Sequence, residues 1–554
     1  MRPYRVCLAI LVLCSAAGLF EAVGADELSS GDELRALYSD RFAFTDGGMP
    51  LVTVEIMSHQ DKITLGADSG VVVRPRGHGG AEVSAGNRWT VEVENATPGA
   101  LREWTVVARL DVVDDAGIDA ELSRWLGRGF EPARFEVGTV FGVDGEVIDS
   151  REVLIGVDGV SEGKGSARAA KIGKRWKLET SLYTELVERP SGTLVATSND
   201  GAVVRNPSVL WFGASDPDKT IDVEDVVHGG GGSQLDAERT EDRSYWGEVY
   251  VTIGRDAKLI AVNSVTADKL LAGLVPSEIF PDAHAEALAA QAIAARTEVL
   301  SRIGTRHLAD PFLVCSNQHC QVYSGAGKET PRTTRAVAKT RGIVMLREGG
   351  GLVDARYSAS CGGHSEHNEN IWGGDPDPSL RGHLDATDGG ASRMGIFDQG
   401  VTDNNVSRFL AGGNDDAYCG ATKYARNRYR WTKTIDRRAL TKLVAKHYAG
   451  VGTVRSLEPM ERGVSGRINK LRVSGDKGEA IVTGDLHIRR LLGGLRSTLF
   501  TVRVNDGAFE LTGAGFGHGV GMCQTGAIGR AEAGQSHETI LRHYYDGMRT
   551  HRLY

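Results

Sequence analysis

The segment His307-Leu-Ala-Asp-Pro-Phe-Leu-Val-Cys315-Ser-Asn-Gln-His319-Cys320 brings two imidazoles and two thiols into one short stretch. Thiolate and imidazole donors together favour a tetrahedral zinc ion. The alternative is a buried disulfide between Cys315 and Cys320 with two surface histidines, because exported proteins can form disulfides. Taken alone, the segment therefore indicates either a zinc site or a disulfide.

An alanine-rich run, residues 281–303, precedes this segment and is the clearest helix in the sequence, with Gly304 as a natural stop. Glu278 lies in the loop that enters this helix, and Glu286 lies one to two turns inside it. Apolar neighbours on both sides of Glu278 predict a raised pKa, which a general acid requires. For either glutamate the alternative is an acidic residue that stabilises the helix N-terminus.

A second motif is Gly513-Ala-Gly515-Phe-Gly517-His518-Gly519-Val-Gly521-Met-Cys523-Gln524. Its glycines allow the backbone to approach a ligand closely. The motif lacks the Lys-Ser/Thr ending of a phosphate-binding loop. The alternative is a glycine-rich turn in a sheet, but the polar anchors favour ligand binding through His518 and Gln524.

A third motif is Tyr357-Ser-Ala-Ser360-Cys361-Gly-Gly-His364-Ser-Glu366, which Trp372 follows. Its serine, cysteine and histidine could form a nucleophile with a base, but their spacing matches neither a hydrolase elbow nor a papain-type site. The favoured interpretation is a loop that lines a sugar groove, with Tyr357 and Trp372 as aromatic platforms.

The N-terminus resembles a targeting signal. Arg2 and Arg5 precede an apolar run that ends in small residues at Ala25. This pattern predicts a signal peptide, residues 1–25, and an exported protein that is periplasmic or extracellular. Cys14 leaves open a lipid anchor. No later run predicts a transmembrane segment, and the formal net charge of −8 disfavours nucleic-acid binding, which requires a basic face.

At 554 residues the chain should form two to four domains, and its pattern predicts a multi-domain α+β fold rich in β structure. We expect an N-terminal β-rich domain (26–110), a small α+β segment (111–213), an acidic glycine-rich linker (214–244) and a β-rich domain that carries the alanine-rich helix (245–554). The predicted strands are 51–57, 63–65, 70–73, 89–93, 104–110, 135–141, 153–157, 249–253, 259–262, 342–346, 352–358, 468–473 and 479–482. The other predicted helices are 118–127, 165–172, 437–448 and 537–546.

A series of motifs in one order across residues 245–554 resembles the family of stage II sporulation protein D and the amidase enhancer. The motifs are Leu271-Ala-Gly-Leu-Val-Pro-Ser-Glu278, Glu286-Ala-Leu-Ala-Ala-Gln291-Ala-Ile-Ala-Ala-Arg296-Thr297, Cys320-Gln-Val-Tyr323-Ser-Gly325, Thr340-Arg-Gly342, Tyr357-Ser-Ala-Ser-Cys-Gly-Gly363, Arg462-Gly-Val-Ser-Gly466, Arg496-Ser497 and Gly517-His-Gly-Val-Gly-Met522. Ile279-Phe280 stands where the family usually has Met-Pro, and Cys523 stands where Ser is common.

The resemblance implies a lytic transglycosylase that cleaves denuded peptidoglycan strands, with Glu278 as the single catalytic residue. It implies a structural zinc ion held by His307, Cys315, His319 and Cys320, since four protein ligands leave no position for water. We expect the substrate groove to be lined by Gln291, Tyr357, Ser360, Trp372, Arg496, His518 and Gln524.

Two alternatives stay open. Some members of the family are described as enhancers of a cell-wall amidase, so this chain could be a noncatalytic peptidoglycan-binding activator of such a partner. The other alternative is a zinc-dependent hydrolase, which needs an open metal position. Residues 111–213 also resemble, faintly, a SPOR-type glycan-binding module.

Overall fold

The computed structural model describes residues 37–38, 43–45, 47–77, 80–143, 146–228, 239–317, 319–505 and 507–554. The predicted signal peptide, residues 1–25, lies outside the described residues, and so does the Gly229-Gly-Gly-Gly-Ser233 run of the predicted linker. Within the described ranges, none of the helices combines the length and the apolar character needed to cross a membrane.

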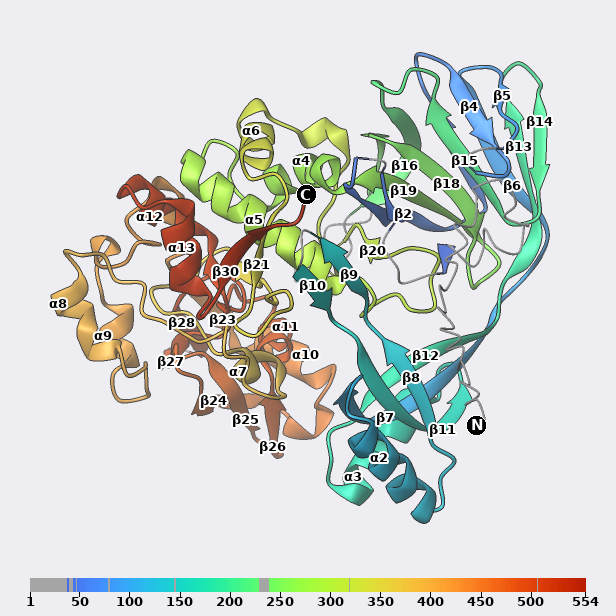
Figure 1. The fold of residues 1–554 in the computed structure, drawn as a ribbon. Coiled ribbons are helices and arrows are strands. Elements are labelled where there is room, and N and C mark those ends of the chain that lie inside the picture. The colour runs from blue at the N-terminus through green and yellow to red at the C-terminus, as the bar shows by residue number, and fades with distance from the viewer. Residues whose placement is uncertain are drawn as a thin grey trace, which may run out of the picture.

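Two sheets pack face to face at the upper right of Figure 1. The first sheet has the order β1-β2-β19-β18-β15-β4-β5, with β20 parallel to β2, and the second has the order β14-β13-β6-β3-β16-β17. The strands of the first are Ala43–Phe44, Pro50–Gln60, Leu259–Thr266, Glu248–Ile253, Val209–Ala214, Val71–Arg74 and Val83–Ser84, with β20 at Val314–Cys315; those of the second are Val203–Asn206, Ser191–Ser198, Arg88–Thr97, Lys62–Gly66, Ile221–His228 and Arg239–Tyr245. Buried Trp89 and Phe212 meet from opposite sheets, with ring centroids 6.4 Å apart, which places the core between the sheets.

This sandwich joins segments that the sequence pattern separates. The first sheet combines strands from residues 26–110 with strands from residues 245–554. The predicted linker is wrong as a description of its described residues, because β16 and β17 form an antiparallel pair within 214–244 and at its end. Ile221, Val223 and Val226 are buried, and these few apolar side chains are sufficient for a strand that packs on one face only.

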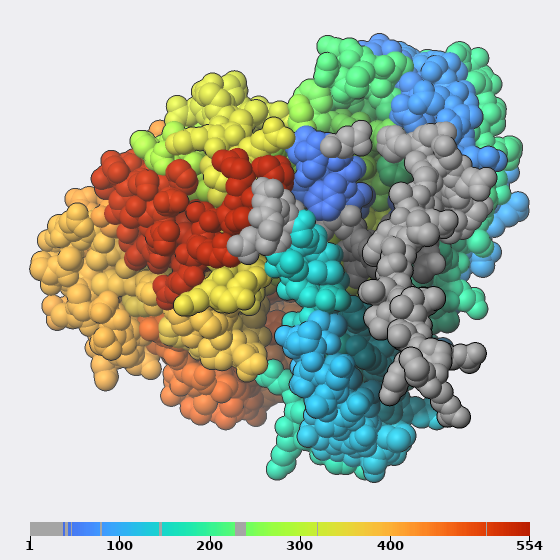
Figure 2. All heavy atoms as spheres, viewed as in Figure 1, coloured from blue at the N-terminus to red at the C-terminus, as the bar shows by residue number. Residues whose placement is uncertain are grey.

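A four-stranded unit is inserted between β6 and β13 and lies at the lower right of Figure 1. Its elements are β7 (Ala100–Asp111), α2 (Asp115–Gly127), β8 (Ala133–Val137), β11 (Glu152–Ser161), α3 (Gly165–Trp176) and β12 (Ser181–Glu188). The sheet order β12-β7-β11-β8 and the β-α-β-β-α-β sequence are those of a ferredoxin-like split βαβ unit. In the space-filling view, the unit forms the blue-to-cyan lobe at the bottom of the molecule, beside the orange C-terminal half (Figure 2).

The inserted unit also carries a hairpin, β9 (Val140–Val143) and β10 (Glu146–Asp149), between β8 and β11. The sequence predicted one strand over 135–141, but the structure breaks it into β8 and β9. Gly138 lies at the break with φ of 90°, a conformation that ends a regular strand. Its backbone N–H donates to the Gly304 carbonyl oxygen at 2.6 Å, which ties the unit to the end of the central helix.

The central helix is α5 (Ala285–Arg302), and it is buried along most of its length. It packs against α4 (Ala267–Glu278), α6 (Pro331–Lys339), α12 (Gln524–Glu532) and α13 (His537–Tyr544). Its many alanines permit this close packing on several sides. The sequence predicted a start at residue 281, but His284 caps the helix by accepting from the Glu286 N–H at 3.3 Å. Glu286 therefore lies in the first turn of α5.

Short strands connect this helical layer to the rest of the C-terminal half. β21 (Ile343–Leu346) pairs with β30 (Arg549–Arg552), and β22 (Tyr357–Ser358) pairs in parallel with β29 (Met522–Cys523). The short helices α7, α8 and α9 span Asn368–Trp372, Ala391–Met394 and Val406–Leu410. The predicted strand 352–358 is thus reduced to its last two residues and one bridge at Leu352.

A further core lies at the lower left of Figure 1. It is built by β23 (Arg430–Asp436), β28 (Ala508–Ala514) and β27 (Phe500–Asn505), by β24 (Val454–Arg462), β25 (Ile468–Gly475) and β26 (Glu479–Thr483), and by α10 (Arg437–Ala445) and α11 (Asp485–Leu491). The predicted β-rich, multi-domain α+β class is confirmed, as are the predicted helices near 118, 165, 437 and 537.

Candidate active site and metal centre

Glu278 is the last residue of α4, where the helix opens into an extended backbone at Ile279. The expectation of a loop at Glu278 is wrong. Pro276 lies in the last turn of α4, and because proline removes a helical hydrogen bond, the sequence there resembled a loop. The glutamate is half-buried and faces a cavity of about 510 Å³. The Glu278 side chain is therefore held by the end of a helix, which is more rigid than a loop.

The cavity draws its lining from segments that are far apart in the chain. The lining residues are Glu278, Glu298, Cys320, Gln321, Val322, Arg356, Tyr357, Ile371, Trp372, Asp485, Leu486, Arg489 and His518. It brings together Glu278 with three of the predicted groove residues, namely Tyr357, Trp372 and His518. Sequence reasoning missed the polar residues of this lining on α5, after β21 and on α11.

The surroundings of Glu278 favour its protonated form. Burial, together with the negative charge of Glu298, raises its pKa from the ordinary value of 4.5 to about 7, although the backbone amide of Val322 acts in the opposite direction. A carboxyl group with a pKa near 7 keeps its proton in a substantial fraction of molecules at neutral pH. It therefore has the electrostatics of a general acid.

A chain of hydrogen bonds runs along the wall beside Glu278. The Tyr357 hydroxyl donates to Gln321 Oε1 at 2.6 Å, and Gln321 Nε2 donates to Glu298 Oε2 at 2.6 Å. The other oxygen of Glu298 accepts from Arg302 at 3.1 Å. Both oxygens of Glu298 are thus engaged, which makes it a poor nucleophile. Burial raises the pKa of Glu298 above its ordinary value, while the charges of Arg302 and Arg356 favour its ionised form. Gln321 could have been suspected from its place directly after Cys320.

Another part of the cavity lining is aromatic and cationic. The His518 and Trp372 rings lie 5.0 Å apart, and the Arg356 guanidinium lies 4.7 Å from the Trp372 ring centroid. His518 Nδ1 accepts from the Val520 N–H, so Nε2 carries the hydrogen and donates to the Tyr357 carbonyl oxygen at 2.9 Å. Burial and the charge of Arg356 lower the pKa of His518 to about 3, so the ring is neutral.

Two predicted groove residues lie behind Glu278 and not in the cavity lining. Gln524 Nε2 donates to the Glu278 backbone oxygen at 2.8 Å and to Gln291 Oε1 at 3.1 Å. Both glutamines are buried. They therefore fix the end of α4. Ser360 is fully buried, and Arg496 also lies outside the lining of this cavity.

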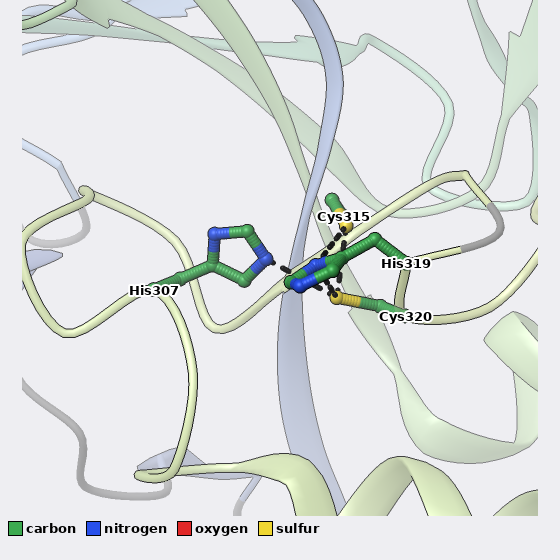
Figure 3. Close-up of side chains that lie close together, drawn as sticks. All are labelled: His307, Cys315, His319 and Cys320. Atoms are coloured by element: carbon green, nitrogen blue, oxygen red, sulfur yellow. Dashed lines mark hydrogen bonds between the residues drawn. The ribbon is translucent and has the colours of Figure 1, made fainter. Parts of the chain in front are cut away.

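The four predicted metal ligands converge, as Figure 3 shows. Their ligand atoms lie within 4.8 Å of one another. His307 Nε2 lies 3.2 Å from Cys320 Sγ, and His319 Nδ1 lies 3.7 Å from both sulfurs. His307 Nδ1 bonds Asp310 at 3.0 Å, the arrangement by which a carboxylate orients a metal-binding imidazole. The four donors thus converge as the ligands of one metal site would. Cys315 and Cys320 are free thiols, and their sulfurs lie 2.8 Å apart, closer than the edge of about 3.8 Å that a bound tetrahedral zinc ion requires.

Residues 255–346 match the family model described as Stage II sporulation protein, and residues 366–521 match one described as a domain of unknown function. Stage II sporulation protein D of Bacillus amyloliquefaciens is 27% identical over 305 residues, which cover 52% of this chain and 75% of that protein. The predicted resemblance to this family is confirmed.

Two other relatives are similar over a comparable share of this chain. The amidase enhancer of Bacillus subtilis is 27% identical over 302 residues, 50% of this chain but only 39% of that protein. An uncharacterised protein of Brachyspira hyodysenteriae is 27% identical over 290 residues, 52% of this chain and 68% of that protein. Each similarity thus concerns about half of this chain.

Proposed function

We propose that the protein is a lytic transglycosylase that cleaves denuded peptidoglycan strands outside the cytoplasm. The observation that carries this proposal is the half-buried carboxyl group of Glu278, with a pKa raised to about 7, in a cavity walled by aromatic side chains. A cell-wall role also agrees with the names of its relatives, stage II sporulation protein D and an amidase enhancer.

In the proposed reaction, Glu278 donates its proton to the glycosidic oxygen between N-acetylmuramic acid and N-acetylglucosamine. The resulting carboxylate then accepts the proton of the muramic C6 hydroxyl, whose oxygen attacks C1 and closes a 1,6-anhydro ring. One carboxyl group suffices for this sequence, whereas ordinary glycosidases use two. The engaged oxygens of Glu298 agree with a single working carboxyl group.

The walls of the cavity hold the sugar chain in this proposal. Trp372 is 48% exposed and offers a flat apolar surface to a sugar ring. His518 shapes the wall, because both of its ring nitrogens are engaged with the backbone. The Tyr357 hydroxyl, which donates to Gln321, can still accept a hydrogen bond from the substrate, and Arg356 holds the Trp372 indole in place through its cation–π contact. Gln291 and Gln524 act indirectly, because they hold the backbone of Glu278.

The test compares Glu278→Gln with the wild type on denuded glycan strands. Glutamine keeps the shape of the side chain but cannot donate the proton, so we expect turnover to fall on the order of 10²-fold or more, with binding retained. Mass spectrometry of the products should find 1,6-anhydro-muramyl ends. Glu286→Gln, on the neighbouring helix, is the matched control and should retain most of its turnover.

A second candidate function is activation of a cell-wall amidase, which the name of the Bacillus subtilis relative favours. Its test adds the wild type or Glu278→Gln to an amidase acting on intact peptidoglycan. Equal stimulation by both proteins, with no anhydro product from either, would replace the transglycosylase proposal.

We further propose that His307, Cys315, His319 and Cys320 hold one structural zinc ion. The ion would cross-link β20 and the loops beside it, and because four protein ligands close its shell, a zinc-hydrolase mechanism is disfavoured. His319→Ala should lose one equivalent of zinc by elemental analysis and lower the Tm, since metal binding is coupled to folding. A covalent bond between Cys315 and Cys320 in nonreducing peptide maps of the wild type would contradict this proposal.

A further inference from the structure

A second cluster of metal-ligating side chains lies in the C-terminal half, away from the predicted zinc site. Cys361, Asp385, Cys419 and Cys523 have their ligand atoms within 4.8 Å of one another. All four side chains are buried, with exposures of 0–1%. They come from the loop after β22, from two loops of the 366–521 region, and from β29. The sequence motifs gave no indication that these four residues meet.

The sulfur geometry suits one small ion. Cys361 Sγ lies 3.7 Å from Cys419 Sγ and 3.6 Å from Asp385 Oδ2. A tetrahedral zinc ion with bonds near 2.3 Å to sulfur has sulfur–sulfur edges of about 3.8 Å. An iron–sulfur cluster places several atoms between its ligands, so donors this close leave no room for one.

The carboxylate is held as a ligand and not as a solvated acid. Asp385 Oδ1 accepts from Arg530 Nε at 3.0 Å and from the Tyr544 hydroxyl at 3.1 Å. These contacts direct Oδ2 toward the thiols. Such hydrogen bonds to a ligand's other oxygen are the usual outer support of a metal site. Arg530 also compensates the negative charge that three thiolates and a carboxylate would carry around a divalent ion.

Backbone amides support the sulfur atoms as well. The Cys361 N–H and the Gly526 N–H donate to Cys523 Sγ at 3.0 and 3.2 Å, and the Gly363 N–H donates to Cys361 Sγ at 3.4 Å. Amide donors aimed at sulfur stabilise its ionised form. At Gly526 a Cβ atom would collide with Asp385 Oδ2, so the first turn of α12 depends on glycine to leave this space.

We propose that Cys361, Cys419, Cys523 and Asp385 form a second structural site for a zinc-class divalent cation. Binding displaces the thiol protons and joins the 366–521 region to β29 and α12. Because β29 pairs with β22, the ion would brace the wall of the cavity that contains Tyr357. Metal binding at this second site does not depend on whether Glu278 is catalytic, so the two proposals can fail separately.

The test is elemental analysis of the full-length wild type, purified without chelators. We expect two equivalents of zinc per chain. His319→Ala should retain one, Cys523→Ser should also retain one, and the double variant should retain none. Serine is nearly isosteric with cysteine and can still accept the amide hydrogen bonds. Cys523→Ser should therefore disturb this buried position less than a substitution by alanine.

A second measurement tests the site even where Cys523→Ser fails to fold. Cobalt added to the metal-free Cys315→Ser/Cys320→Ser protein, whose first cluster has no sulfur left, should give an intense thiolate-to-cobalt charge-transfer band, because Cys361, Cys419 and Cys523 would bind it. A single zinc equivalent in the wild type that is lost in His319→Ala overturns the proposal. So does a disulfide between any two of Cys361, Cys419 and Cys523 in nonreducing peptide maps.

Discussion

At the scale of single residues, Glu278 satisfies two conflicting requirements that the proposed mechanism places on its proton donor. A proton donor must be partly withdrawn from water to keep its proton, yet it must reach the substrate. Its place at the end of α4 gives both, because the side chain is half-buried and still faces the cavity. The charge of Glu298 adds to the effect of burial and raises the pKa of Glu278 further.

This arrangement predicts the pH dependence of the proposed cleavage reaction. Glu278 loses its proton as the pH rises through about 7, so turnover should decline above that pH. Glu298→Gln removes one cause of the raised pKa, and the alkaline limb of the pH–rate profile should move to lower pH. Glu286→Gln is the control, because Glu286 contacts Lys339 and His537 and not the cavity. An unmoved limb in Glu298→Gln would contradict the role of this charge.

The sequence predicted the properties of residues whose surroundings are set by their neighbours along the chain. The apolar flank of Glu278 predicted its raised pKa, and the residue types of the His307–Cys320 segment, together with the family resemblance, predicted a convergent donor set. Glu298, Arg356 and Asp485 were missed, because only the packing of separate segments brings them to the cavity. Gln291 was assigned to the groove because the pattern could not show that α5 is buried on almost every side.

At the scale of elements, the start of α5 is fixed by Glu286. Its carboxylate accepts from Lys339 Nζ at 2.7 Å, from the His537 backbone N–H at 2.8 Å and from His537 Nδ1 at 2.6 Å. These contacts connect α5 to α6 and α13. Burial alone would raise the pKa of Glu286, but the hydrogen bonds lower it to about 2. Glu286 therefore matches the alternative interpretation given for it from the sequence, an acidic residue that stabilises the N-terminus of a helix.

Glu286→Gln should therefore destabilise the protein. Charge-assisted hydrogen bonds contribute about 1.5–3 kcal/mol each, so we expect the variant to have a lower Tm than the wild type. Because the folded pKa lies below the ordinary value of 4.5, the stabilisation is complete above that pH and is lost as the pH falls toward 2. The difference in Tm from the wild type should thus narrow between pH 5 and pH 3. A difference that is constant with pH would exclude the charge as its cause.

At the scale of the whole molecule, the inserted unit meets the central helix at two glycines. Gly138 and Gly304 both have positive φ, and a Cβ atom on Gly304 would lie 2.7 Å from the Gly138 carbonyl carbon. The sequence predicted Gly304 as a helix stop, and it predicted the α+β character of the unit. It could not predict this contact, nor that the sandwich takes strands from both sides of the unit, because both depend on pairing between distant segments.

Gly304→Ala should loosen the inserted unit. The methyl group forces the two backbones apart, and the left-handed conformation adds a strain of order 1–2 kcal/mol. Gly163→Ala is the matched control, because Gly163 has a similar φ of 81° but no neighbour within 4 Å of a Cβ atom. Hydrogen exchange should be faster in the β9–β10 hairpin of Gly304→Ala than in Gly163→Ala. Equal exchange in both variants would show that the contact does not hold the unit.

The inserted unit leaves and re-enters the sandwich through adjacent strands. Thr97 at the end of β6 lies opposite Ser191 at the start of β13, so the two ends of the insertion are one strand spacing apart, about 5 Å. A bridge of a few residues could replace the entire unit without disturbing the register of either sheet. The unit is therefore joined to the sandwich as a self-contained insertion whose two ends lie side by side.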